Sequence, residues 1–138
     1  MQKILMIEDN PADITLWRLA LDRTGEHYML QILPDGEAAL KFVREHRTGM
    51  HDPEPCVILL DLYLPKHNGI EVLRAIKKEP VLAHIQVLVW TSAASYIELK
   101  EIQDLGAICR EKPSGLTGFE ELAIEVLEIC KGSLSLRD

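Results

Sequence analysis

The stretch from residue 56 to residue 65 reads CVILLDLYLP, and its first five residues form the most apolar run of the chain. This run is bounded by Pro55 and Asp61. Its length and β-branched content are typical of a strand buried on both faces, as in parallel sheets covered by helices. A carboxylate that directly follows four buried apolar residues costs stability unless it has a compensating partner. The stretch therefore predicts a central strand that ends in an acidic group.

Apolar runs alternate with amphipathic stretches on both sides of this strand. We predict strands at residues 3–9, 27–33, 56–60, 85–90 and 107–112. Helices are predicted at residues 11–25, 36–47, 69–76, 93–105 and 117–132, the last beginning with a capping box of Thr117 and Glu120. Strands that alternate with helices through short links specify a doubly wound α/β fold, in which helices cover both faces of a parallel sheet.

Charged and polar side chains mark two of these strands as sheet edges. The strand at 107–112 carries Arg110 and Glu111, and the strand at 27–33 begins with His27. Charges on a strand protect an edge from unwanted pairing. A flavodoxin-like strand order of 2-1-3-4-5 places both strands at edges. In that order the winding reverses between strands one and three, and ligands bind outside the carboxyl ends of the strands at such a switch point.

Composition indicates an ordinary globular domain and excludes several classes of protein. The chain has 138 residues, of which 47% are hydrophobic and 27% charged, so it can form a core. A net charge of −7 argues against binding nucleic acid or anionic membrane by bulk charge. Asp61 interrupts the longest apolar run, and the first residues lack the layout of a signal peptide. We therefore expect a cytoplasmic protein without a membrane span.

Cysteine usage leads to the same expectation. Cys56, Cys109 and Cys130 are odd in number, far apart and in no CxxC arrangement. We interpret them as packed thiols in a reducing compartment.

Acidic residues gather at the predicted switch point. Glu8 and Asp9 end the first strand, and Asp61 ends the third. Like charges a few ångströms apart repel each other, so at least one pKa should be raised unless a cation compensates. Oxygen ligands on a partly open surface suit a hard divalent ion, most naturally Mg²⁺.

A hydroxyl and an ammonium belong to the same rim of the sheet. Thr91 ends the fourth strand and Lys112 ends the fifth. Together with a metal they supply what a tetrahedral anion requires, because Lys112 offsets its charge and Thr91 donates a hydrogen bond. A carboxylate beside a metal and a phosphate site can accept a phosphoryl group. Asp61 is central among the candidates and is predicted to be the acceptor.

These residues resemble a known family. Glu8-Asp9-Asn10, Asp61-Leu62-Tyr63-Leu64-Pro65 with Gly69 behind it, Thr91-Ser92-Ala93 and Lys112-Pro113 are similar to the receiver domain of two-component response regulators. The resemblance runs from about residue 3 to residue 131. It implies a receiver domain at residues 1–132, a short tail at 133–138 and no output domain.

The resemblance also implies roles for the site residues. Asp61 would accept a phosphoryl group from a histidine kinase or a phosphotransfer protein. Asp9 and Asp61 would bind Mg²⁺ directly, Glu8 through water, and Tyr63 through its backbone carbonyl.

On the phosphoryl side, the resemblance implies that Thr91 and Lys112 hold the oxygens of the transferred group. The bond between Lys112 and Pro113 would be cis, which proline makes possible. Phosphorylation would switch a protein-interaction face.

The sequence departs from this family at one position. Receivers of this kind usually carry an aromatic residue three positions before the lysine, where this chain has Cys109. We therefore expect output to depend on movement of the helix at 93–105, whose Tyr96 and Leu99 are left for a partner. A second hypothesis is that the ring of Tyr63 shields the acyl phosphate from water.

A finer resemblance concerns partners. The segment at 61–69 and the Pro-containing loop before the third strand are similar to those of single-domain receivers that serve phytochrome-type histidine kinases. Such receivers often pair through the face of the fourth helix, fifth strand and fifth helix, so a homodimer is expected. No direct nucleic acid binding is expected, and the downstream protein target is open.

Other readings remain as alternatives. A phosphatase of the haloacid dehalogenase type needs a second acid where Tyr63 stands, so turnover as an enzyme is not expected. A flavin carrier needs a phosphate loop rich in Ser, Thr and Gly, whereas residues 8–13 read EDNPAD. A degenerate receiver, acting as a constitutive interaction module or a phosphate sink, is the alternative kept open by Cys109.

Overall fold

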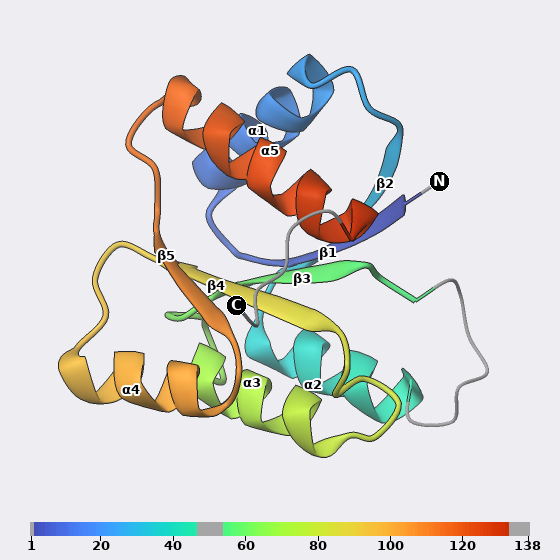
Figure 1. Cartoon of the computed structure of the whole chain (residues 1–138). Helices are drawn as coiled ribbons and strands as arrows, with labels where there is room; N and C mark the ends of the chain where they lie inside the picture. Colours follow the sequence, from blue (N-terminus) through green and yellow to red (C-terminus); the bar gives the residue numbers. More distant parts are fainter. Residues whose placement is uncertain (1, 47–53, 133–138) are drawn as a thin grey trace.

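The computed structural model describes residues 2–46 and 54–132. Helices and strands alternate as predicted: β1 (Gln2–Ile7), α1 (Pro11–Arg23), β2 (Tyr28–Leu33), α2 (Gly36–His46), β3 (Val57–Asp61), α3 (Gly69–Lys78), β4 (Gln86–Thr91), α4 (Tyr96–Asp104), β5 (Ile108–Glu111) and α5 (Leu116–Lys131). The strands form one parallel sheet of order β2-β1-β3-β4-β5. Helices α1 and α5 lie on one side of it, and α2, α3 and α4 lie on the other (Figure 1). The predicted fold, strand order and edge strands are confirmed.

Alternate residues of the central strands pack into two separate hydrophobic cores, one on each face of the sheet. Ile58 and Leu60 of β3 belong to the cluster that includes α2 and α3, whereas Val57 and Leu59 belong to the cluster that includes α1 and α5. All four side chains are fully buried. Successive side chains of a strand point to opposite faces, so a strand covered on both sides must be apolar at every position. This explains why the run before Asp61 carries no polar residue.

Strand register determines which functional residues lie side by side at the ends of the strands. Ile7 of β1 pairs with Leu60 of β3, so the residue after Ile7 lies level with Asp61. Asp61 pairs with Trp90, and Thr91 pairs with Glu111 on β5. The carboxyl ends of β1, β3, β4 and β5 therefore meet at one edge of the sheet.

The beginnings of two helices differ from the prediction. Helix α5 begins at Leu116 after Gly115, which makes no side-chain capping bond, so the predicted capping box of Thr117 and Glu120 is wrong. Thr117 already lies inside the helix, where its hydroxyl cannot occupy a capping position. Helix α4 instead has the capping box, made by Ser95 and Glu98. Its S-x-x-E pattern was present in the sequence, but the helix was predicted to begin before it.

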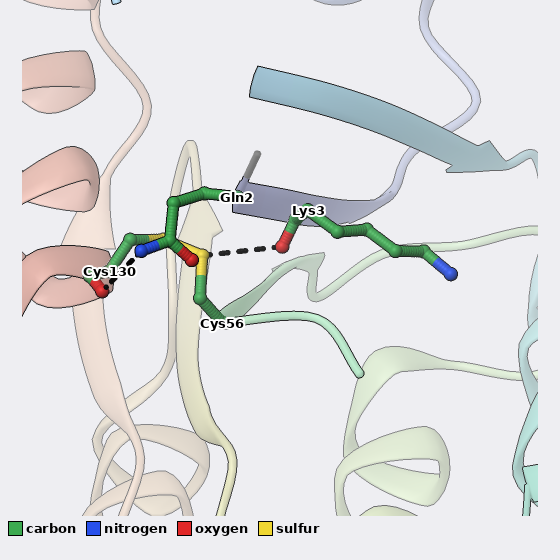
Figure 2. Close-up of a disulfide and its surroundings, with 4 residues drawn as sticks. All are labelled: Gln2, Lys3, Cys56 and Cys130. Atoms are coloured by element: carbon green, nitrogen blue, oxygen red, sulfur yellow. Dashed lines mark hydrogen bonds between the residues drawn. A yellow bond between two sulfur atoms is a disulfide. The ribbon is translucent and has the colours of Figure 1, made fainter. Parts of the chain in front are cut away.

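The prediction of three packed thiols is wrong for two of the cysteines. Cys56 and Cys130 form a disulfide, and Cys109 is free (Figure 2). They are 74 positions apart in the sequence, yet their Cα atoms are 5.0 Å apart. The last turn of α5 lies beside the beginning of β3, an arrangement that cysteine spacing does not reveal. Cysteine usage therefore carries no argument about a reducing compartment.

Gln2 and Lys3 make two hydrogen bonds beside the disulfide. The side-chain amide of Gln2 donates to the carbonyl oxygen of Cys130 at 3.1 Å (Figure 2), and the backbone N–H of Cys56 donates to the carbonyl oxygen of Lys3 at 2.8 Å. The beginnings of β1 and β3 are thus joined to the last turn of α5. This junction lies opposite the carboxyl ends of the strands.

The predicted cis bond before Pro113 is also wrong, because the described residues contain no cis peptide bond. Trans is the favoured form even before proline, and with it the N–H of Lys112 donates to the carbonyl oxygen of Thr91 at 2.8 Å. Residues 47–53, which make up most of the Pro-containing loop predicted before the third strand, and the tail at 133–138 lie outside the described residues. Among the helices described, none has the length and apolar content needed to cross a bilayer.

Candidate functional site

The predicted acidic residues meet at the carboxyl edge of the sheet. Glu8 is fully buried and Asp61 is 4% exposed, whereas Asp9 lies at the surface. One carboxylate oxygen from each lies within 4.8 Å of the others. Their backbone supports them: the N–H groups of Asp9 and Asn10 donate to Oε2 of Glu8 at 3.0 and 3.1 Å, and the N–H of Tyr63 donates to Oδ1 of Asp61 at 3.3 Å.

A glycine allows the chain to close tightly behind Asp61. The N–H of Gly69 donates to the carbonyl oxygen of Leu62 at 2.7 Å. A Cβ atom at Gly69 would lie 2.4 Å from the backbone oxygen of Asp61, a distance that no side chain tolerates. Gly69 therefore lets the beginning of α3 pack directly on the backbone that carries the acceptor.

Lys112 reaches into the acidic group from β5. Its Nζ lies 2.9 Å from Oε1 of Glu8, 2.9 Å from Oδ2 of Asp13 and 3.5 Å from Oδ2 of Asp61. Asp13 is not among the site residues predicted from the sequence. Asp13 lies in the first turn of α1, where an acidic residue is common because the helix dipole stabilises it. The local sequence therefore gave no sign that Asp13 contacts a lysine far away in the chain.

Burial governs the protonation of these groups. Removal from water raises the pKa of Glu8 to about 7, against the opposing effect of Lys112. It also raises the pKa of Asp61, again against Lys112. Burial by itself would lower the pKa of Lys112, but its close contacts with the carboxylates of Glu8 and Asp13 outweigh this and raise the pKa above its usual value. The acids thus have a cationic neighbour that compensates their charge only in part.

The donor set fits a hard divalent cation. Three carboxylates supply oxygen ligands at short mutual distances, and one of them is exposed, as Mg²⁺ requires when it keeps part of its water shell. Oε1 of Glu8 is buried and accepts no hydrogen bond of good geometry within the described residues, although the ammonium of Lys112 is 2.9 Å away. A cation at this position would offset the charge and lower the raised pKa values.

Thr91 lies at the end of β4 and is 3% exposed. Its hydroxyl makes two long contacts with one residue: Oγ1 donates to the carbonyl oxygen of Ala93 and accepts from its N–H, both at 3.4 Å. Such long hydrogen bonds are weak. The hydroxyl can therefore exchange them for a better acceptor that arrives in the pocket.

Tyr63 and Cys109 flank this part of the site. The Tyr63 side chain is 53% exposed, and its hydroxyl contacts Ala93 and Glu98 at the beginning of α4. The contact with Glu98 raises the pKa of the Tyr63 hydroxyl, so it stays protonated at neutral pH. Cys109 is half-buried, and burial raises the pKa of its thiol.

Comparisons with known proteins agree with this geometry. Residues 4–110 match the family model described as response regulator receiver domain. Response regulator Rcp1 of Synechocystis sp. strain PCC 6803 is 42% identical over 90 residues, which cover 65% of this chain and 61% of that relative. The matched stretch thus spans less than two thirds of the relative.

Two solved structures are similar over 99% of both chains. The Mn²⁺-bound form of Rcp1 superposes with a TM-score of 0.83 at 31% identity. The phosphorylated cyanobacterial phytochrome response regulator RcpA superposes with a TM-score of 0.84 at 30% identity.

Proposed function

Because the chain belongs to the response regulator receiver domain family, we propose that it accepts a phosphoryl group on Asp61 from a histidine kinase or a phosphotransfer protein. The observation that carries this proposal is the position of the Asp61 carboxylate. It is buried at the meeting point of two further acids and lies 3.5 Å from the ammonium of Lys112. This combines a nucleophile with the charge compensation that a phosphoryl group needs.

Mg²⁺ is the proposed cofactor. Asp9 and Asp61 would bind it directly, Glu8 through water, and Tyr63 through its backbone carbonyl. When bound, the ion supplies positive charge that offsets the carboxylates and the incoming phosphoryl oxygens. The acidic cluster of the described residues supports this choice, and the Mn²⁺-bound form of Rcp1 is a divalent-metal form of a relative.

The transfer itself moves one group between two partners. An oxygen of Asp61 forms the new bond to phosphorus while the bond from phosphorus to the donor's imidazole nitrogen breaks, and that nitrogen keeps the electron pair. Lys112 and Thr91 hold the phosphoryl oxygens. The protein supplies mainly positioning and charge compensation, because little other covalent chemistry is needed.

The proposed product stays on the protein, so we infer a signalling module and not an enzyme with turnover. A phosphatase using the same intermediate needs a second acid two residues after the nucleophile. That position is Tyr63, whose side chain turns toward α4. The alternative is a degenerate receiver that acts as a constitutive interaction module or a phosphate sink. The gathering of Glu8, Asp61 and Lys112 disfavours the constitutive module, whereas a phosphate sink would use the same acceptor site.

A phytochrome-type histidine kinase is the proposed source of phosphoryl groups, supported by the likeness to RcpA over 99% of both chains. The proposed output face consists of α4, β5 and α5, where phosphorylation would switch binding of a protein target or of a second copy. Tyr96 and Ile97 support this, because they are 81% and 77% exposed on α4.

The deciding experiment is phosphorylation by a small acyl-phosphate donor with Mg²⁺, followed by mass spectrometry of the intact protein. We expect one phosphate adduct on the wild type and none on Asp61→Asn. Asp104→Asn is the matched control, since it makes the same change at an exposed acid of α4. An unlabelled wild type, or an Asp61→Asn variant labelled as fully as the wild type, would contradict the proposal.

A further inference from the structure

Tyr63 reaches from the loop after β3 to the beginning of α4. Its hydroxyl oxygen lies 2.7 Å from the carbonyl oxygen of Ala93 and 2.9 Å from Oε1 of Glu98. A phenol has one proton, which it donates to one of these acceptors or shares between them. At the other end of the same residue, the backbone N–H donates to Asp61. One residue therefore connects the proposed phosphoacceptor with α4.

The contact on α4 involves the group that begins the helix. The same Oε1 of Glu98 accepts the N–H of Ser95 at 2.9 Å, and the N–H of Glu98 donates to Oγ of Ser95 at 3.1 Å. These two bonds form the capping box of α4. The Tyr63 hydroxyl thus adds a third hydrogen-bonding group to the cap and ties it to the rim of the pocket.

Ala93 is the point where two hydroxyls compete. Its carbonyl oxygen lies 2.7 Å from the Tyr63 hydroxyl and 3.4 Å from Oγ1 of Thr91. A hydroxyl with one proton cannot donate to Ala93 and to a phosphoryl oxygen at once. A Thr91 hydroxyl that donates to a phosphoryl oxygen no longer donates to Ala93, so the segment between β4 and α4 loses one of the two hydroxyls that hold it.

Open space lies on the other side of this segment. A hollow of about 300 Å³ separates it from β5, with Ser92, Ala94, Leu99 and Cys109 in its lining. A larger side chain in place of Cys109 would occupy part of this space. The segment and the first turn of α4 therefore have room to shift on the β5 side, while the Tyr63 hydroxyl restrains them from the β3 side.

We propose that the Tyr63 phenol is a latch that holds α4 in its resting position and is released when Asp61 is phosphorylated. This inference rests on the proposed function, because the release requires Thr91 to turn to the phosphoryl group. The latch couples the pocket to the exposed Tyr96 and Ile97 on the first turn of α4. It supplies a connection between site and surface in a chain that has Cys109 at the position of the usual aromatic residue.

Hydrogen exchange without any phosphoryl group tests whether the Tyr63 hydroxyl restrains α4 in the unphosphorylated protein. Tyr63→Phe removes the hydroxyl and keeps the ring. We expect the amides of Glu98 and Leu99 to exchange about fivefold faster in this variant than in the wild type, as for the loss of one hydrogen bond from a local opening equilibrium. Tyr96→Phe is the matched control, because it removes an exposed hydroxyl from the same turn, and we expect no change. Equal exchange in Tyr63→Phe and wild type would overturn the latch.

Release of the latch is tested with beryllium trifluoride in the presence of Mg²⁺. Beryllium trifluoride is a tetrahedral analogue of the phosphoryl group, and fluorine NMR follows its binding to the wild type. We expect binding to speed exchange at the same amides of the wild type, and to add little in Tyr63→Phe. If the analogue binds and exchange in the wild type stays constant or slows, release is wrong. If neither the analogue nor phosphate attaches to Asp61, the proposed function fails and with it the release, while the resting comparison still decides whether the hydroxyl restrains α4.

Discussion

The ammonium of Lys112 lies 2.9 Å from a carboxylate oxygen of Asp13, a residue 99 positions earlier in the chain. Two contacts of equal length, with Asp13 and Glu8, hold the ammonium, and its contact with Asp61 is longer at 3.5 Å. Asp13 therefore draws Lys112 toward α1 and away from the proposed acceptor. This arrangement leaves more of the Asp61 carboxylate available to a metal.

The first prediction concerns the removal of this carboxylate. In Asp13→Asn the ammonium should shift toward Glu8 and Asp61 and compete with Mg²⁺, so the apparent Kd for Mg²⁺ should rise roughly tenfold, equivalent to about 1.4 kcal/mol. Tryptophan fluorescence can follow the titration, because Nζ of Lys112 lies 5.3 Å from the ring centre of the buried Trp90. Glu111→Gln removes an exposed acid near the same strand end and should have a much smaller effect. Equal effects in both variants would contradict a positioning role for Asp13.

A second prediction separates the ring of Tyr63 from its hydroxyl. If the ring excludes water from the acyl phosphate, Tyr63→Ala should hydrolyse it roughly fivefold faster, which corresponds to about 1 kcal/mol of barrier. Tyr63→Phe keeps the ring and should stay closer to the wild type. Loss of radioactive phosphate from the purified phosphorylated proteins measures both rates. An unchanged rate in Tyr63→Ala would rule out shielding.

The third prediction follows from the raised pKa of Glu8, which is about 7 in the folded protein against an ordinary value of 4.5. The folded state then binds more protons than the unfolded state between these values. This contribution is fully present below pH 4.5 and is lost as the pH rises toward 7. In metal-free protein the free energy of unfolding of the wild type relative to Glu8→Gln should thus fall by roughly 1–3 kcal/mol across this range.

Urea unfolding at several pH values, with a chelator present, measures this difference. The comparison with Glu8→Gln removes every contribution that the two proteins share. Mg²⁺ should flatten the dependence, because a bound cation favours the ionised carboxylate. A difference that stays constant from pH 4.5 to 7 would contradict the raised pKa.

A fourth prediction concerns the disulfide between Cys56 and Cys130. It closes a long loop, with 74 positions between its ends. Reduction should therefore lower the free energy of unfolding by about 2–4 kcal/mol. Denaturant unfolding of the wild type with and without a reductant measures the loss. Cys130→Ser should lose a similar amount and respond little to the reductant, whereas a strong response in that variant would show that the effect lies elsewhere.

The fifth prediction tests the proposed homodimer. With a phosphoryl donor and Mg²⁺ present, the sedimentation coefficient of the wild type should increase from that of a monomer to that of a dimer. Ile97→Asp places a charge on the exposed first turn of α4 and should prevent this change. Leu19→Asp makes the same substitution at an exposed position of α1, on the other side of the sheet, and should leave the change intact. Equal behaviour of both variants would exclude α4 from the interface.

Local patterns were sufficient to predict the fold. The apolar run before Asp61 and the charges of Arg110 and Glu111 act through neighbours close in sequence or through burial of a whole strand. The strand order followed from them, and parallel strands then had to bring Glu8 and Asp61 to the same edge. The roles of these residues in metal binding and phosphoryl transfer stay predictions.

Contacts between distant side chains were decided only by the tertiary structure. The pairing of Cys56 with Cys130 and of Lys112 with Asp13 depends on where α5 and α1 lie against the sheet and on their rotation about their own axes. The reach of Tyr63 to Glu98 depends on the loop that positions the ring. Periodicity shows which face of a helix is buried, but it does not show which side chain of another element meets that face. The sequence by itself therefore determined the architecture and the edge where the acids gather, and packing of the elements decided their partners.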